Sequence, residues 1–272
     1  MSHFTVLVVT KDGDYEKALA PFDETLEVEP YISETKEEII QNEKVRYERY
    51  KQGLSNGEND EWFEKYNKGV DWSDDDSIIK HYYEYWSDEE HDEDYNRLST
   101  YNPNSKWDWY SLGGRWINTL KLKEKVAPIA ESRPSLIQFE LPEDGYTDHA
   151  QMKDIDFTPS KKEIKNAERF WEVVVEEQPL RPDEKEEDFH TWWKKEYYLD
   201  KYGSKEEYVR CQTELFTYAL LYEGEWIEPG EMGWFGMENS TKDSNEWYRE
   251  RFREIVSNLS PEDYISVIDC HI

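Results

Sequence analysis

One short segment collects residue types that could bind a ligand. Residues 102–116 read NPNSKWDWYSLGGRW and contain three tryptophans, a tyrosine, two adjacent glycines and one arginine. Arg115 offers a planar fork of donors that suits a phosphate or a carboxylate. Gly113 and Gly114 allow the backbone to approach a ligand closely or to adopt a positive φ. The segment is therefore a candidate nucleotide or anion site.

Trp107 and Trp109 of the same segment add flat rings on which a base could stack. The alternative is structural: the rings pack in the core, and the segment is a bend that leads into a strand at residues 115–123. No helix follows the glycines, so they match neither a dinucleotide-binding fingerprint nor a P-loop. This favours the structural interpretation and leaves Arg115 as the first residue to mutate.

Two other groups contain possible metal ligands or nucleophiles. The segment TDHAQMKDIDF holds three aspartates and a histidine without a recognised metal-binding spacing. At the C-terminus, Cys270 and His271 could meet His3 if the terminal strands pair, either as zinc ligands or as a nucleophile and its base. Neighbouring residues of a strand point to opposite faces, which counts against a joint site of Cys270 and His271. The residues of the first group are Asp148, His149, Asp154 and Asp156.

The sequence contains no HExxH, CxxC, Walker or serine-elbow motif. We therefore expect no metal, no cofactor and no catalysis. A small metal-dependent enzyme that uses the aspartates, or Cys270 with His271, stays open as an alternative.

The elements that must position these residues alternate between strands and helices without a repeated βαβ unit. Both ends of the chain, HFTVLVVT and EDYISVIDCHI, are β-branched apolar runs typical of buried strands. The sequence predicts an α+β fold, in which a mostly antiparallel sheet contains both terminal strands and carries two acidic helical insertions. The expected core domain comprises residues 1–32, 101–158 and 213–272, and the expected insertions are residues 33–100 and 159–212.

The charge of the chain restricts its partners. There are 63 acidic residues against 33 basic ones, and the formal net charge is −30. Such a surface repels nucleic acid and anionic membranes and attracts basic proteins. Aromatic residues form 15% of the chain, which argues for an ordered protein because their rings bury large areas. No run of 18 apolar residues and no signal peptide is present, so we expect a cytoplasmic protein that uses no membrane.

The acidic charge is densest in residues 71–94, which contain eleven acids and one lysine. If this segment were one helix, its charges would recur roughly every 3.6 Å, close to the phosphate spacing of one DNA strand. The segment is thus a candidate DNA mimic, and the alternative is a solvated acidic face. The acids expected to contact a partner are Asp74, Asp75, Asp76, Asp88, Glu89 and Glu90.

Four segments carry a resemblance to known proteins. The start MSHFTVLV, the segment LAPFDETLEVEPY, the core NPNSKWDWYSLGGRW and the segment DIDF together resemble a family of bacteriophage and prophage proteins, over residues 1–32 and 100–156. A phage origin implies counter-defence in the host bacterial cytoplasm. The class of function we expect resembles that of the Gabija anti-defence proteins, which bind a host nuclease complex.

The expected partner is therefore a host anti-phage nuclease complex, whose DNA access or cleavage would be blocked without catalysis and without direct nucleic-acid binding. Homo-oligomers are possible. A second hypothesis from the residues is a sponge for a nucleotide second messenger, which would use Arg115, Trp107 and Trp109 despite the opposing net charge.

Overall fold

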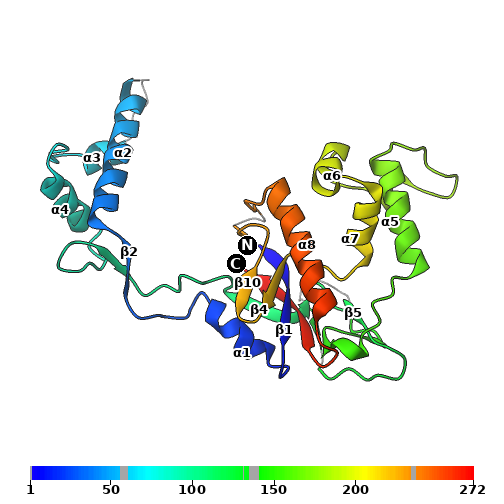
Figure 1. The fold of residues 1–272 in the computed structure, drawn as a ribbon. Helices are drawn as coiled ribbons and strands as arrows, with labels where there is room; N and C mark the ends of the chain where they lie inside the picture. The colour runs from blue at the N-terminus through cyan, green and yellow to red at the C-terminus, as the bar shows by residue number, and fades with distance from the viewer. Residues whose placement is uncertain (1, 56–60, 131, 135–140, 234–236) are drawn as a thin grey trace. The chain divides into compact units, whose positions relative to one another are not determined.

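The structure is a computed structural model that describes residues 2–55, 61–130, 132–134, 141–233 and 237–272. The chain divides into two compact units (Figure 1). Residues 1–24 with 104–272 form the larger unit, here called the sheet unit. Residues 25–103 form the smaller one, here called the acidic unit.

The two terminal strands form the centre of the main sheet. β1 (His3–Thr10) and β11 (Tyr264–His271) are antiparallel, and their register runs from His3 opposite His271 to Thr10 opposite Tyr264. Both strands are buried over their six inner residues. Their valines and isoleucines suit a strand that is covered on both faces. The N- and C-termini consequently lie side by side (Figure 1).

The main sheet has seven strands in the order β10-β9-β1-β11-β4-β6, and β8 also pairs with β11. Strand β9 is parallel to β1 and β6 is parallel to β4, whereas the other pairs are antiparallel. A two-stranded sheet of β5 and β7 lies outside it. The remaining strands of the sheet unit are β4 (Trp109–Gly114), β5 (Leu120–Lys121), β6 (Arg133–Pro134), β7 (Tyr146–Thr147), β8 (His149–Gln151), β9 (Ala219–Tyr222) and β10 (Glu225–Ile227).

A separate core covers each face of this sheet. On one face, Tyr248, Phe252 and Ile255 of α8 (Lys242–Asn258) pack in the same cluster as Leu7 and Val267. On the other face the cluster holds Phe4, Val6, Ile268 and Cys270, together with residues of α1 (Tyr15–Leu19) and the short 3₁₀ helix that follows it (Ala20–Phe22). Successive side chains of β1 and β11 point to opposite faces of the sheet and therefore lie in these two cores in turn.

Three further helices of the sheet unit pack around aromatic rings. Trp171, Tyr198 and Tyr208 are buried in one cluster. A capping box of Ser160 and Glu163 begins the first of these helices. The helices are α5 (Lys161–Val174), α6 (Lys195–Tyr202) and α7 (Lys205–Thr213), and short 3₁₀ turns occur at Met152–Asp154 and Glu186–Phe189.

The acidic unit has a small apolar core of its own. Ile39, Ile40, Ile78, Ile79 and Tyr82 are buried where α2 packs on α4. The elements of this unit are β2 (Tyr31–Glu34), α2 (Lys36–Ser55), α3 (Glu61–Tyr66), α4 (Asp75–Tyr85) and β3 (Arg97–Ser99), and β2 pairs with β3.

The predicted α+β class, with both terminal strands in one mostly antiparallel sheet, is confirmed. The strand predicted at 115–123 is only partly right: residues 115–118 form a turn, and only Leu120–Lys121 (β5) form a strand. The preceding segment WYSLGG, which we did not expect to be a strand, forms β4. The sequence also predicts a strand at SLIQFELP, residues 135–142, of which 135–140 lie outside the described residues. The apolar spacing of NEWYRERFREIVSNL predicts an amphipathic helix with Trp247 on its apolar face. The helix is confirmed as α8, but Trp247 is exposed and the neighbouring Tyr248 is buried instead.

The acidic segment 71–94 is not one helix. Only Asp75–Tyr85 is helical, and its N-cap is Asp74, although Ser73 is also a residue type that the sequence offers as a cap. The acids after residue 86 follow in turns and irregular chain. The match to the phosphate spacing of a DNA strand required one continuous helix over all of these acids. Because the helix covers only part of the segment, the acids do not have that regular spacing. The acidic composition remains, distributed over a helix end and a loop.

Ion pairs in the sheet unit make its stability sensitive to acid. Arg169 binds Glu184 through two nitrogens, at 2.8 and 2.7 Å, and these hydrogen bonds lower the pKa of Glu184 from 4.5 to about 2. Lys121 and the Thr158 backbone likewise lower the pKa of Asp156 from 3.8 to about 2. A carboxyl group whose pKa is lower in the folded than in the unfolded state stabilises the fold when the pH is above its unfolded-state pKa. This stabilisation is lost as the pH falls through the folded-state pKa.

We therefore expect the melting temperature to fall as the pH is lowered from about 4.5 to about 2. The variant Glu184→Gln should melt lower at neutral pH and show a shallower decline across this window. Glu187→Gln, at an exposed position of the same loop, is the matched control and should follow the native curve. Equal slopes for Glu184→Gln and the native protein would contradict the assignment.

Candidate functional site

Three neighbouring strands bring polar residues together at one end of the main sheet. In β1, β11 and β4, directly paired residues share a face, so two successive rows can be read from the register. Below these rows the same face becomes the apolar core under α8. We call this region the polar sheet end, and its two rows are His3–His271–Trp109 and Thr5–Asp269–Ser111.

A carboxylate orients each histidine of the polar sheet end. His3 Nδ1 lies 2.8 Å from Asp269 Oδ1, and His271 Nδ1 lies 2.6 Å from Asp108 Oδ1. The two rings meet edge to face with centroids 4.8 Å apart. A carboxylate on Nδ1 fixes the ring and leaves Nε2 to accept a proton or to ligate a metal. The described residues contain no group of three or more metal-ligating side chains, so the pair offers two imidazoles at most.

Cys270 is not part of this pair. It points to the opposite face, is fully buried with Phe4 and Ile268, and burial raises the pKa of its thiol well above the usual value. The sequence argument that Cys270 and His271 face opposite ways is therefore confirmed. A nucleophile pair of these two residues is excluded by the geometry of the strand.

The two glycines of the segment 102–116 are needed for close packing against buried carboxylates. Gly113 and Gly114 both have positive φ, +74° and +54°. A Cβ on Gly113 would lie 2.3 Å from Asp148 Oδ2, and a Cβ on Gly114 would lie 2.3 Å from the Cβ and Oδ2 of Asp269. Both positions therefore require glycine for conformation and for space, which supports the structural interpretation of the pair.

The carboxylates behind these glycines hold the turn that follows. Asp269 Oδ2 accepts the backbone N–H of Arg115 at 2.9 Å. Asp148 accepts the backbone N–H groups of Thr119 at 3.0 Å and Asn118 at 3.3 Å, and its burial raises its pKa. Two buried acids thus satisfy three donors of one turn, which compensates part of the cost of burying them.

The tryptophans of the segment do not form a stacking platform. Trp107 is buried, donates its indole N–H to the Leu19 carbonyl at 3.2 Å, and meets Tyr110 edge to face. Trp109 is 50% exposed and approaches the His3 ring at 6.1 Å. A base could contact only Trp109, so the structure does not bring together the two rings on which the nucleotide hypothesis depends.

Arg115 keeps unused donors. Its backbone is held by Asp269, but its side chain forms no ion pair with any described residue, and its Nε is buried without a hydrogen-bond partner there. Among the proposed binding residues of this segment, Arg115 and the half-exposed Trp109 are thus the ones that the fold leaves available.

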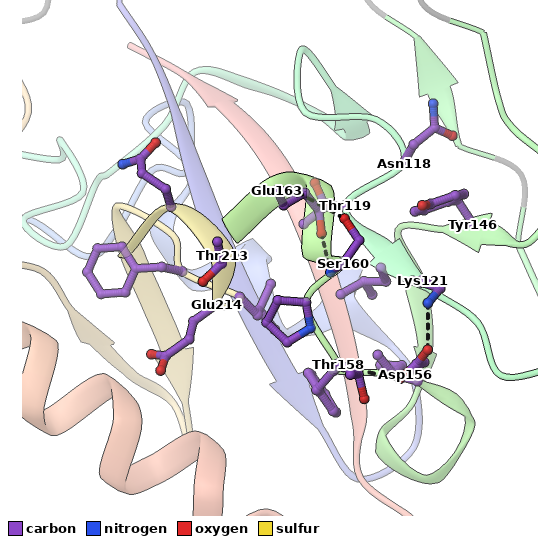
Figure 2. A pocket seen from close by; sticks show the side chains of 17 residues that line it. Asn118, Thr119, Lys121, Tyr146, Asp156, Thr158, Ser160, Glu163, Thr213 and Glu214 are labelled. Atoms are coloured by element: carbon purple, nitrogen blue, oxygen red, sulfur yellow. Dashed lines mark hydrogen bonds and ion pairs between the residues drawn. The ribbon is translucent and has the colours of Figure 1, made fainter. Parts of the chain in front are cut away.

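No metal site forms from the aspartates of the segment 147–157. His149 is buried, bonds Ser266 at 2.7 Å, and has its pKa lowered by burial. Asp156 pairs with Lys121 at 2.6 Å in the wall of a cavity of about 290 Å³ (Figure 2). In the same wall, Glu163 accepts the Ser160 N–H at 2.6 Å. The charged side chains of this cavity already have partners, so it offers an incoming ligand little.

With this geometry described, the chain can be compared with known proteins. No family model, curated protein or solved structure matches it. In the part of the chain that the structure describes, none of the helices has both the length and the apolar character that crossing a bilayer requires.

The acids proposed to contact a partner all lie in the acidic unit. Some of them form ion pairs with nearby basic residues, which neutralise part of the charge of this surface. Asp76 pairs with Lys36 at 3.2 Å, Asp75 pairs with Lys44, and Asp74 is used as the cap of α4. Glu89 lies 3.8 Å from Arg97, whereas Asp88 and Glu90 are exposed and make no ion pair with a described residue. The loop after α4 is therefore the more available half of this surface.

The sequence did not identify Asp108 and Asp269 as partners of the histidines. The alternation of the last strand was the available signal, because it places Asp269 and His271 on one face. Asp108 lies before β4, and only the pairing of β4 with β11 shows that it reaches His271.

Proposed function

We propose that this protein is a phage counter-defence protein that binds a basic surface of a host anti-phage nuclease complex and thereby blocks DNA access. The observation that carries the proposal is the acidic unit, a separate compact unit with its own core. Residues 25–103 contain 22 acids and 9 bases, a net charge of −13. A nuclease must present basic surface to bind DNA, so an acidic protein competes for the same surface.

Aromatic residues accompany the exposed acids of this unit. Tyr85, Trp86 and Tyr95 flank or lie within the acidic loop that follows α4, and between 38 and 41% of each is exposed. Exposed tryptophan and tyrosine are the residue types that most often dominate protein–protein binding energy. Acids that attract a basic partner and rings that can be buried against it therefore occur together, which favours a protein partner over a solvated face.

Co-purification tests this proposal. Tagged protein expressed in bacteria that carry anti-phage defence systems should retain a nuclease complex at low salt and lose it as salt rises, because salt screens exposed charges. Reversing Asp88, Glu90 and Glu93 to lysine should weaken this binding roughly tenfold or more at low salt.

The matched control reverses three exposed acids of the sheet unit, Asp183, Glu186 and Glu187, to lysine. It changes the net charge by the same amount and should bind almost as the native protein does. If both triple variants weaken binding equally, overall charge and not the acidic unit is responsible. A folded Asp88/Glu90/Glu93 variant that binds and inhibits normally would refute the proposed surface.

A further inference from the structure

Two arginines of the sheet unit are almost fully buried, and their surroundings differ. Every nitrogen of Arg169, which is 8% exposed, has a partner: Nε and Nη2 donate to Glu184, Nη2 also donates to the Pro179 carbonyl, and Nη1 donates to Glu172. Arg249 of α8 is 6% exposed, and its Nε lies 3.3 Å from Glu207 Oε1. The two terminal NH₂ groups of Arg249 form no hydrogen bond or ion pair with a described residue, and they are not among the enclosed polar atoms that lack a partner, so they remain accessible.

Unused donors of a largely buried but still accessible guanidinium can bind a ligand without first breaking a contact within the protein. The carboxylate nearest to Arg249 is also shared, because Glu207 accepts a shorter bond from Arg253 at 2.9 Å. Arg249 is therefore only partly neutralised, in a chain where acids outnumber bases almost two to one.

The donors of Arg249 adjoin a cavity. This cavity of about 230 Å³ lies where α6, α7 and α8 meet the start of β9, and Arg249 and Lys201 both line it. Lys201 bonds the Tyr197 hydroxyl at 3.1 Å and lies over tyrosine rings, and it forms no ion pair with a described residue. The cavity thus receives two cationic side chains that carboxylates do not fully neutralise.

The rest of the lining suits a ring with an anionic group. Aromatic side chains, Phe216, Tyr202 and Tyr248 among them, form the apolar part of the wall. Glu238 is the one carboxylate among the described lining residues, and it is exposed. The Cys211 thiol adds no charge at neutral pH, since burial raises its pKa to about 11.

We propose that this cavity binds a small organic oxyanion, with its phosphate or carboxylate on Arg249 and Lys201 and a flat ring against the aromatic wall. A guanidinium fork and an oxyanion match in geometry, and charge-assisted hydrogen bonds in a partly buried site are stronger than exposed ones. An aromatic wall with a few convergent polar groups is the usual composition of small-molecule sites.

Titration calorimetry with three related probes tests the proposal on the full chain. Phenyl phosphate should bind saturably, inorganic phosphate should bind more weakly because it lacks the ring, and phenol should not bind because it lacks the anion. Benzoate in a fourth titration distinguishes a carboxylate from a phosphate preference. Absence of saturable binding of both phenyl phosphate and benzoate would refute the site.

Arg249→Met should weaken the binding of the preferred probe by roughly 10- to 100-fold. This variant should still fold, because Glu207 keeps its bond to Arg253. The matched control is Arg251→Met on the exposed face of the same helix, where an ion pair to Glu254 is lost without an effect on binding. If Arg249→Met does not fold, Lys201→Met provides the same test. Unchanged affinity in a folded Arg249→Met or Lys201→Met variant would overturn the assignment.

Discussion

Gly114→Ala is expected to destabilise the sheet unit by about 3 kcal/mol, because strain at a positive φ adds to overpacking of a filled site. The new Cβ would lie 2.3 Å from the Cβ of Asp269, an atom close to the backbone of a central strand that cannot turn away. Gly113→Ala meets the end of the Asp148 side chain instead and should cost less than Gly114→Ala. Urea unfolding of the purified variants measures both values.

Gly203→Ala is the matched control for these substitutions. Gly203 also has a positive φ, +73°, but nothing lies within 4 Å of the position of its Cβ. The loss of stability in Gly203→Ala should therefore reflect backbone strain alone and amount to about 1 kcal/mol. Similar costs at positions 114 and 203 would show that close packing against Asp269 is not the reason for the glycine.

Trp107→Ala is expected to cost about 3–5 kcal/mol, the usual range for removing a buried tryptophan. Its ring packs in the core beneath β1 and β11, and its indole N–H holds the Leu19 carbonyl. Truncation would leave both a large cavity and an unsatisfied carbonyl. Thermal unfolding should show a strongly lowered transition or none.

Trp109→Ala, two residues further along the same motif, is the matched comparison. Half of this ring is exposed, so its removal should change stability by about 0.5 kcal/mol or less. A large loss of stability in Trp109→Ala, or a small one in Trp107→Ala, would contradict the burial of these rings. If Trp109→Ala folds normally but loses a biological activity, the polar sheet end takes part in function.

The sequence predicted the parts of the fold that depend on local pattern. The β-branched runs at 3–10 and 264–271 identify their own strands, because such a pattern is a property of a few neighbouring residues. The sequence did not predict the strand β4, because its residues WYSLGG include two glycines, which are unfavourable in an isolated strand. Pairing with β11 outweighs that local preference.

The candidate sites show the same division. The residue types of the segment 102–116 indicated a ligand site or a packed bend, and sequence could not decide between them. The structure decides by position: Trp107 lies in the core, Trp109 lies at the surface, and the two glycines pack against acids that are 35 and 155 residues away in the chain. Arg249 gave no sequence signal, because its surroundings come from three helices and a strand.

Composition alone determined the acidic character of this protein, because net charge is a sum that needs no coordinates. The expectation of a basic partner follows from that charge and stays a prediction. Local pattern determined most elements and the α+β class. Only the tertiary structure decided which charges are available, since pairing of Asp75 and Asp76 with lysines of α2, of His3 with Asp269, and of Arg169 with Glu184 joins residues that are distant in sequence. Short-range forces act on such residues only after the chain has folded them together.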